Sequence, residues 1–190
     1  VATMLLAGIA INALAGALTG LITFAPDEQQ LRNITFWMLG SLGGATWENI
    51  MAVFPFIIIP ILLLPRMGKA LNAFALGENQ TAQLGLKANT IKRNVVILAT
   101  MAVGAAVAVS GIIGFVGLLV PHTIRLLIGV DNKHVLPASA LLGALMLTLA
   151  DMLCRTIIAP IELPIGVITA LLGTPLFLYI LIKDKKKLVL

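Results

Sequence analysis

Residues 94–124 read NVVILATMAVGAAVAVSGIIGFVGLLVPHTI, a run of 31 residues without a formally charged side chain. The hydrocarbon core of a bilayer is about 30 Å thick, and a helix of about 20 apolar residues crosses it. The run is therefore too long for one ordinary span. Gly111 and Gly114 offer a break, because glycine permits the backbone conformations of a tight turn. We predict two transmembrane spans here, at about 94–110 and 114–129, joined by a tight turn at 111–113.

The rest of the chain has the same character. Of its 190 residues, 59% are hydrophobic and only 11% are charged, whereas a soluble domain has about 25% charged residues. The sequence therefore predicts an all-α, polytopic membrane protein with six transmembrane helices in one domain over residues 1–190. The first apolar run starts at the first residue with no Lys or Arg before it, so we expect the chain to be the C-terminal part of a longer protein. The four further spans are predicted at 1–24, 50–64, 136–157 and 163–182.

The basic residues indicate the orientation of these spans. Six spans place the loops 66–93 and 130–135 and the C-terminal tail on one side of the membrane. That side carries eleven of the thirteen Lys and Arg residues, and only Arg32 and Arg155 fall on the other side. Cytoplasmic loops of membrane proteins are enriched in Lys and Arg, so this side is expected to be cytoplasmic. The net charge of +5 therefore indicates topology and contact with anionic lipids, and it does not indicate nucleic-acid binding.

The long loop at about 66–93 is the most informative segment outside the predicted spans. Residues 69–94 read KALNAFALGENQTAQLGLKANTIKRN. Gly77 breaks the apolar pattern and Gly85 ends it, which predicts two short helices. Two readings remain open for these helices: they dock on a partner protein, or they lie in the membrane interface.

Charged residues near the opposite side of the membrane have two readings each. Asp151 and Arg155 are spaced i, i+4 on the fifth span, and intramembrane charges are usually paired or functional. They form a mutual ion pair, or Arg155 reaches a partner protein. Arg32 lies in an amphipathic segment at about 31–39. It binds an anionic group of a ligand, or it pairs with Asp27 or Glu28.

We predict no catalytic or metal site in this chain. His122 and His134 have no Cys or carboxylate at ligand spacing, and the sequence contains no HExxH, GxSxG or P-loop motif. His122 is expected to be structural, and the lone Cys154 is expected to be a small packing residue. Glu162 lies just before Pro164 at the predicted start of the last helix, and we expect it to cap that helix.

Six sequence blocks occur in a fixed order: LLAGIAINAL, LRNITFWMLGSLGG, FALGENQTAQLGL, SGIIGFVGLLVPHTIRLL, LADMLCR and ELPIGVITALLGTPLFLYIL. Together they resemble the FecCD-type permease family, from the first residue to about residue 183. Members of this family are membrane subunits of type II ABC importers for iron–siderophore complexes, haem and cobalamin. The resemblance implies a ten-helix permease that works as a homodimer in the bacterial inner membrane, of which this chain would hold helices five to ten, without the first four.

The resemblance also implies partners and roles. Two copies of an ABC ATPase would bind ATP and Mg²⁺, and this chain would bind no cofactor. A periplasmic or surface substrate-binding protein would dock at Arg155. The first helix would line the central pathway, with Thr3 and Asn12 as gate or pathway residues and Arg32 near a haem propionate. The coupling helices that dock on the ATPase would be formed by Ala75, Leu76, Gly77, Glu78, Asn79, Gln80, Thr81, Ala82, Gln83, Leu84 and Gly85.

The segment LRNITFWMLGSLGGATW resembles haem (hemin) permeases in particular, although siderophore permeases share much of it. The expected function is therefore uptake of an iron-containing chelate, haem or a ferric siderophore, driven by a partner ATPase. The alternative is an ion-coupled secondary transporter, which would require intramembrane carboxylates. Asp151 is the one candidate for that role, and it has Arg155 as a neighbour. An intramembrane enzyme is disfavoured because no nucleophile and base have a suitable spacing.

Overall fold

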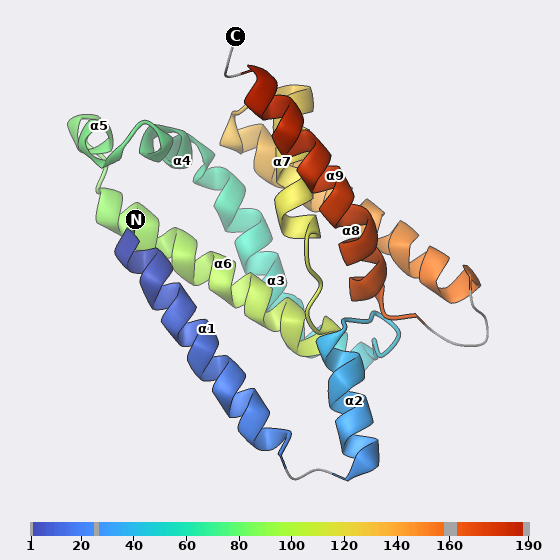
Figure 1. Ribbon diagram of the computed structural model, residues 1–190. Helices are drawn as coiled ribbons and strands as arrows, with labels where there is room; N and C mark the ends of the chain where they lie inside the picture. The colour runs from blue at the N-terminus through green and yellow to red at the C-terminus, as the bar shows by residue number, and fades with distance from the viewer. Residues whose placement is uncertain (1, 25–26, 158–162, 188–190) are drawn as a thin grey trace. The chain divides into compact units, whose positions relative to one another are not determined.

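A computed structural model describes residues 2–24, 27–157 and 163–187 of the chain. The regular elements in these ranges are nine α-helices (Figure 1). The chain divides into two compact units, Val1–Met38 and Leu39–Leu190, which are described separately. In order, the helices are α1 (Ala2–Ile22), α2 (Glu28–Met38), α3 (Trp47–Arg66), α4 (Gly68–Ala75), α5 (Glu78–Gln83), α6 (Ala88–Ser110), α7 (Val116–Ile128), α8 (Asn132–Ile157) and α9 (Ile165–Lys187).

The first unit consists of α1 and α2. Helix α1 has 21 residues and is about 32 Å long at 1.5 Å per residue, which is enough to cross a bilayer. Threonines at its C-terminal end bond to carbonyls of the preceding turn: Thr19 Oγ1 donates to the carbonyl of Ala15 at 2.9 Å, and Thr23 Oγ1 donates to that of Gly20 at 2.9 Å. Such bonds allow hydroxyl side chains in an apolar helix, because no water is available to them in lipid.

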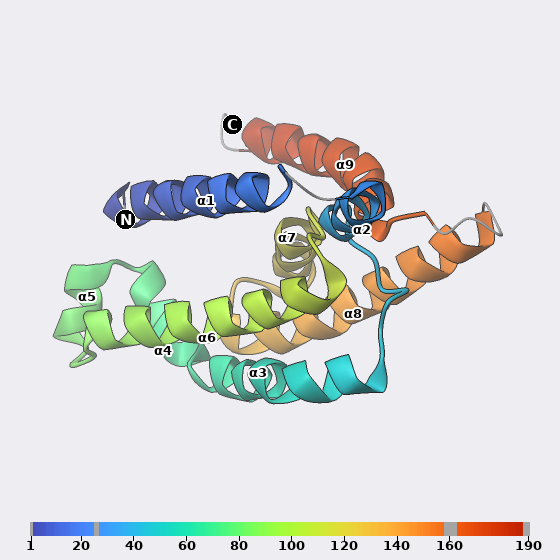
Figure 2. The ribbon, with the colours of Figure 1, turned by 90° about the horizontal axis from the view of Figure 1, so that it is seen from below.

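The second unit packs α3 beside α6, and α7, α8 and α9 against one another (Figures 1 and 2). Its most buried apolar cluster joins Val120 and Ile124 of α7 to Val135 at the start of α8. Many large apolar side chains elsewhere on these helices are exposed. An apolar exterior is expected where the surrounding medium is lipid rather than water.

Within the residues that the structure describes, four helices are long and apolar enough to cross a membrane: Leu5–Ile22, Trp47–Arg66, Ala88–Ser110 and Asn132–Thr156. Two further apolar stretches, Val116–Ile128 and Ile165–Leu178, are shorter. The predicted all-α, polytopic fold is confirmed, and a helix lies within the described residues of each of the six predicted spans. The two short helices in the loop after the second span are confirmed as α4 and α5.

The connection between α6 and α7 differs from the predicted tight turn. Helix α6 ends at Ser110, and the chain then runs without regular structure to Phe115 before α7 begins. The backbone adopts a positive φ at two separate points, Gly111 with φ 70° and Phe115 with φ 65°, and residues 111–115 form a longer link. Helix α7 has only 13 residues and is about 20 Å long. The link therefore takes in the first two residues of the span predicted at about 114–129, and helix α7 begins at Val116.

Three glycines allow this non-helical link to pack tightly, and we call Gly40, Gly166 and Gly173 the glycine junction. A Cβ at Gly40 would lie 2.7 Å from the carbonyl oxygen of Ile112, and one at Gly173 would lie 2.8 Å from Cβ of Phe115. A Cβ at Gly166 would lie only 2.0 Å from the carbonyl oxygen of Leu39. Through these close contacts the backbone of the link packs directly against the glycine junction.

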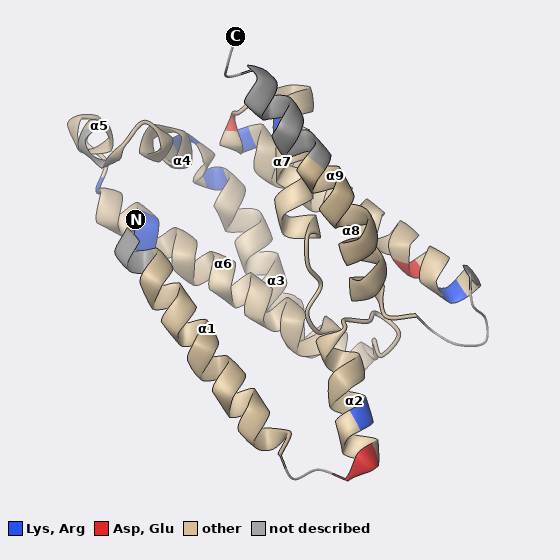
Figure 3. Ribbon diagram, in the orientation of Figure 1, with Lys and Arg blue, Asp and Glu red and all other residues tan. Residues whose placement is uncertain are grey.

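The coloured Lys, Arg, Asp and Glu residues of α3–α8 lie mainly toward the ends of these helices, whose middles are largely uncharged (Figure 3). Lys and Arg gather at the end that carries α4, whereas Asp151 and Arg155 lie near the opposite end of α8. The basic residues at the α4 end are Arg66, Lys69, Lys87, Lys92, Arg93, Arg125 and Lys133.

Candidate coupling and docking sites

The segment 75–85 forms a compact helical corner at the basic end of the second unit. Gly77 has φ 118° and Gly85 has φ 75°, conformations that residues with a Cβ rarely adopt. Gly77 therefore separates α4 from α5, and Gly85 ends the corner before α6. Both breaks fall where the sequence predicts them.

Thr81 is fully buried inside this corner and stabilises it through hydrogen bonds. Its Oγ1 donates to the carbonyl of Ala73 at 2.9 Å and to that of Gly77 at 2.8 Å, which joins α5 to α4. Leu76 and Leu84 are instead 65% and 62% exposed. These two leucines are the large apolar side chains exposed on the corner.

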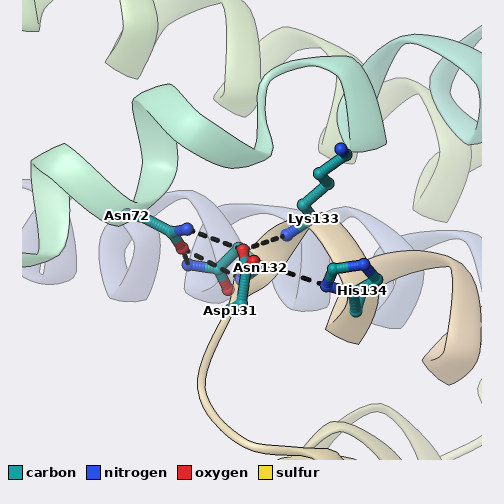
Figure 4. Close-up of polar contacts among 5 residues, drawn as sticks. All are labelled: Asn72, Asp131, Asn132, Lys133 and His134. Carbon is teal, nitrogen blue, oxygen red and sulfur yellow. Dashed lines mark hydrogen bonds and ion pairs between the residues drawn. The ribbon is translucent and has the colours of Figure 1, made fainter.

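A cluster of polar side chains fastens α4 to the first turn of α8, and no sequence pattern predicted it (Figure 4). Asn72 of α4 donates from Nδ2 to Oδ1 of Asp131 at 2.7 Å. Its Oδ1 accepts from both the backbone N and Nδ2 of Asn132, each at 2.9 Å. We call Asn72, Asp131 and Asn132 the α4–α8 clamp. The partners are about 60 residues apart in the sequence, so only the tertiary fold brings them together.

Asp131 is the capping residue of α8. Its Oδ1 accepts from the backbone N of Lys133 at 2.9 Å, and its carbonyl accepts from the backbone N of His134 and Val135. Nδ1 of His134 lies 3.3 Å from Oδ2 of Asp131. The hydrogen bond from Asn72, followed by that from Lys133, holds the pKa of Asp131 below its usual value. The carboxylate therefore stays ionised at neutral pH, as suits the positive end of a helix dipole.

At the other end of α8, the predicted ion pair is present. Nε of Arg155 donates to Oδ2 of Asp151 at 2.9 Å. The Arg155 side chain remains 46% exposed. The pair orients the guanidinium and still leaves much of it accessible.

The pathway residues predicted for the first unit are placed as follows. Asn12 is exposed on α1. Thr3 lies in the first turn of α1, and its side chain is outside the described residues. Arg32 of α2 lies over the ring of Phe36, with 5.6 Å from Cζ to the ring centroid, so its described contact is a cation–π interaction. Glu162, the predicted cap of the last helix, and the side chains of Glu78 and Asn79 also lie outside the described residues.

Two cavities lie among α7, α8 and α9 of the second unit. One of about 450 Å³ is lined in part by His122, Arg125 and Ser139, and another of about 350 Å³ is almost wholly apolar and is lined in part by Phe115 and Gly173. Within the part of the chain that the structure describes, no three His, Cys, Asp or Glu side chains are grouped so as to hold a metal ion.

Among curated proteins, this chain is similar to permease proteins of hemin, vitamin B12 and Fe(3+)-citrate import systems. The hemin transport system permease protein HmuU of Yersinia pestis is 44% identical over 98% of this chain and 56% of its own length. The vitamin B12 import system permease protein BtuC of Vibrio vulnificus and the Fe(3+)-citrate import system permease protein YfmD of Bacillus subtilis are each 38% identical, over 95% of this chain and 54% of their own length. The chain thus spans about half the length of the curated relatives it matches.

Among solved structures, an inward-facing conformation of a putative metal-chelate type ABC transporter is similar to this fold. Its TM-score is 0.88 at 34% identity, and the match covers 94% of this chain and 58% of that one. The family profile of the FecCD transport family matches residues 1–183. This multi-pass membrane chain therefore belongs to the FecCD transport family.

Proposed function

We propose that this chain forms part of the permease of an ABC importer that carries an iron-containing chelate, haem or a ferric siderophore. The observation that carries the proposal is the family match over residues 1–183, joined to a relative whose name gives hemin as its substrate. ATP and Mg²⁺ would act on a separate ATPase, and this chain would itself catalyse no reaction.

The arrangement of the second unit supports two docking sites at opposite ends. The helical corner at 75–85, with its exposed Leu76 and Leu84, is proposed as the coupling segment that binds the ATPase. Arg155 is proposed as the contact for the binding protein. The gathering of Lys and Arg around the coupling segment (Figure 3) favours a cytoplasmic position for that end. A cytoplasmic C-terminus, a bacterial inner-membrane location and a homodimer with two ATPase copies complete the proposal.

The full-length permease, reconstituted in vesicles with its ATPase and binding protein, tests this function. We expect the binding protein to stimulate ATP hydrolysis when it is loaded with haem or a ferric siderophore, and uptake to require ATP. Loading with cobalamin serves as the matched control for substrate class. Uptake driven by an ion gradient without ATP would contradict the proposal and favour an ion-coupled secondary transporter.

Charge reversal at Arg155 tests the docking site. Because like charges opposed across an interface cost several kcal/mol, we expect Arg155→Glu to weaken binding-protein affinity by about tenfold or more. Arg155→Lys keeps a positive charge at this position, so it should weaken binding-protein affinity far less. Surface plasmon resonance on the complete transporter at low salt measures both. Equal affinities for wild type and Arg155→Glu would remove Arg155 from the docking site.

A further inference from the structure

In the α4–α8 clamp, a side chain of α4 accepts a hydrogen bond from the backbone at the start of α8. The first N–H groups of a helix have no partner within it. Asp131 serves the N–H groups of Lys133, His134 and Val135. The remaining N–H of this first turn, that of Asn132, donates to Oδ1 of Asn72. Helix α8 is therefore fully capped only while α4 is in place.

A second contact holds the same two elements together. A Cβ at Gly68, the first residue of α4, would lie 2.6 Å from Cα and 2.7 Å from the backbone N of Lys133. Gly68 therefore lets the backbone of α4 approach that of α8 closely. Side-chain bonds at Asn72 and backbone packing at Gly68 both act on one turn of α8.

That turn is also held by the core of the second unit. Val135 is 2% exposed and packs against Val120 and Ile124 of α7. Pro137 has no N–H to give to the carbonyl of Lys133, but the helix continues through it to Ile157. The first turn of α8 therefore contacts both α4 and α7.

Helix α8 joins the two proposed docking ends in one element. It has 26 residues and is therefore about 39 Å long. Its first turn carries the clamp, and its last turns carry Asp151 and Arg155 with their ion pair of 2.9 Å. The segment α4–α5 continues directly from the clamp through Ala73, which accepts the Thr81 hydrogen bond.

We propose that Asn72 is a positioning residue that couples the two docking sites, because its hydrogen bonds to Asp131 and Asn132 tie the coupling segment to α8 and so to Arg155. The proposal rests on the proposed function. Coupling between two sites is reciprocal and typically changes affinity about 5- to 150-fold. Nucleotide on the ATPase should therefore change the affinity of the binding protein, and the clamp should carry that change.

The test uses the complete transporter in nanodiscs and the substrate-free binding protein. Its Kd is measured without nucleotide and with a non-hydrolysable ATP analogue and Mg²⁺. In Asn72→Asp, two carboxylates face each other across the clamp, and we expect the nucleotide effect on Kd to fall from about fivefold or more to under about twofold. The nucleotide-free Kd should not change, because Arg155 is intact.

A double variant that exchanges the two side chains tests whether the nucleotide effect can be restored. When Asn72→Asp is combined with Asp131→Asn, the amide and the carboxylate change places. The new amide at position 131 then donates to the new carboxylate at position 72, and the nucleotide effect should return. Asn89→Asp, at an exposed site in the first turn of α6, makes the same chemical change elsewhere and should keep the full effect. A merely structural clamp would lower the yield of folded complex without altering the nucleotide effect in what remains.

The outcomes separate the two levels of proposal. If wild type binds both partners and Asn72→Asp keeps the full nucleotide effect, the role of Asn72 is overturned and the proposed function stands. The role of Asn72 is equally overturned if the exchanged pair fails to restore an effect that Asn72→Asp has lost, or if nucleotide has no effect in wild type. If wild type binds neither an ATPase nor a binding protein, the proposed function itself falls.

Discussion

Leu84→Glu is expected to separate ATP hydrolysis from uptake in the reconstituted transporter. Leu84 is 62% exposed at the end of α5, where the proposed coupling segment offers it to the ATPase. Burying an unpaired carboxylate in an apolar contact costs several kcal/mol, and each 1.4 kcal/mol is a factor of ten in affinity. We expect uptake of the chelate to fall about tenfold to a hundredfold, with loss of the stimulation by the loaded binding protein.

The matched control is Asn89→Glu, which adds the same carboxylate at an exposed site in the first turn of α6. An acidic residue is tolerated at the start of a helix, so its uptake should stay near wild type. Phe74 is a less suitable site for the added charge because it is half-buried. Full stimulation in the Leu84→Glu complex would show that the helical corner does not bind the ATPase.

Gly166→Ala is expected to give the largest loss of stability of any single methyl addition in the glycine junction. The added Cβ would lie 2.0 Å from the carbonyl oxygen of Leu39, and that atom belongs to backbone that cannot rotate away. Overpacking of a close contact typically costs about 1 to 3 kcal/mol. We expect a lower melting temperature and a reduced yield of folded protein, measured by thermal unfolding of the purified full-length permease in detergent.

Gly143→Ala is the control, because Gly143 is a helical glycine of α8 whose added Cβ would meet nothing within 4 Å beyond its own stretch of helix backbone. Alanine favours a helix over glycine, so this variant should melt at or above the wild-type temperature. Equal melting of Gly166→Ala and wild type would mean that residues 39 and 166 do not approach each other in the folded protein.

The sequence predicted the helices well because their signals are local. Apolar runs indicated every span, and Gly77 and Gly85 indicated the two ends of α5. In the structure both glycines have a positive φ. The pairing of Asp151 with Arg155 was also foreseeable, since i, i+4 spacing on a helix brings two side chains together.

The α4–α8 clamp and the glycine junction had no such local signal. Asn72 lies in a short helix and Asp131 in a loop, and neither residue stands out in the sequence. Their contact forms only because the tertiary fold brings together two positions about 60 residues apart. The form of the link after Ser110 was missed for a related reason. Gly111 predicts a break, but the second residue with a positive φ is Phe115. A bulky residue rarely adopts a positive φ, so the sequence did not predict this one.

The shortness of α7 has a consequence for how the protein is made. A 13-residue helix is shorter than the about 20 apolar residues that cross a bilayer, so α7 is expected to need its packing partners α8 and α9 to hold its place in the membrane. Its N-terminal anchor, Phe115, packs on Gly173 of α9, which the ribosome synthesises later. The final position of α7 is therefore expected to depend on α8 and α9, which are both translated after it.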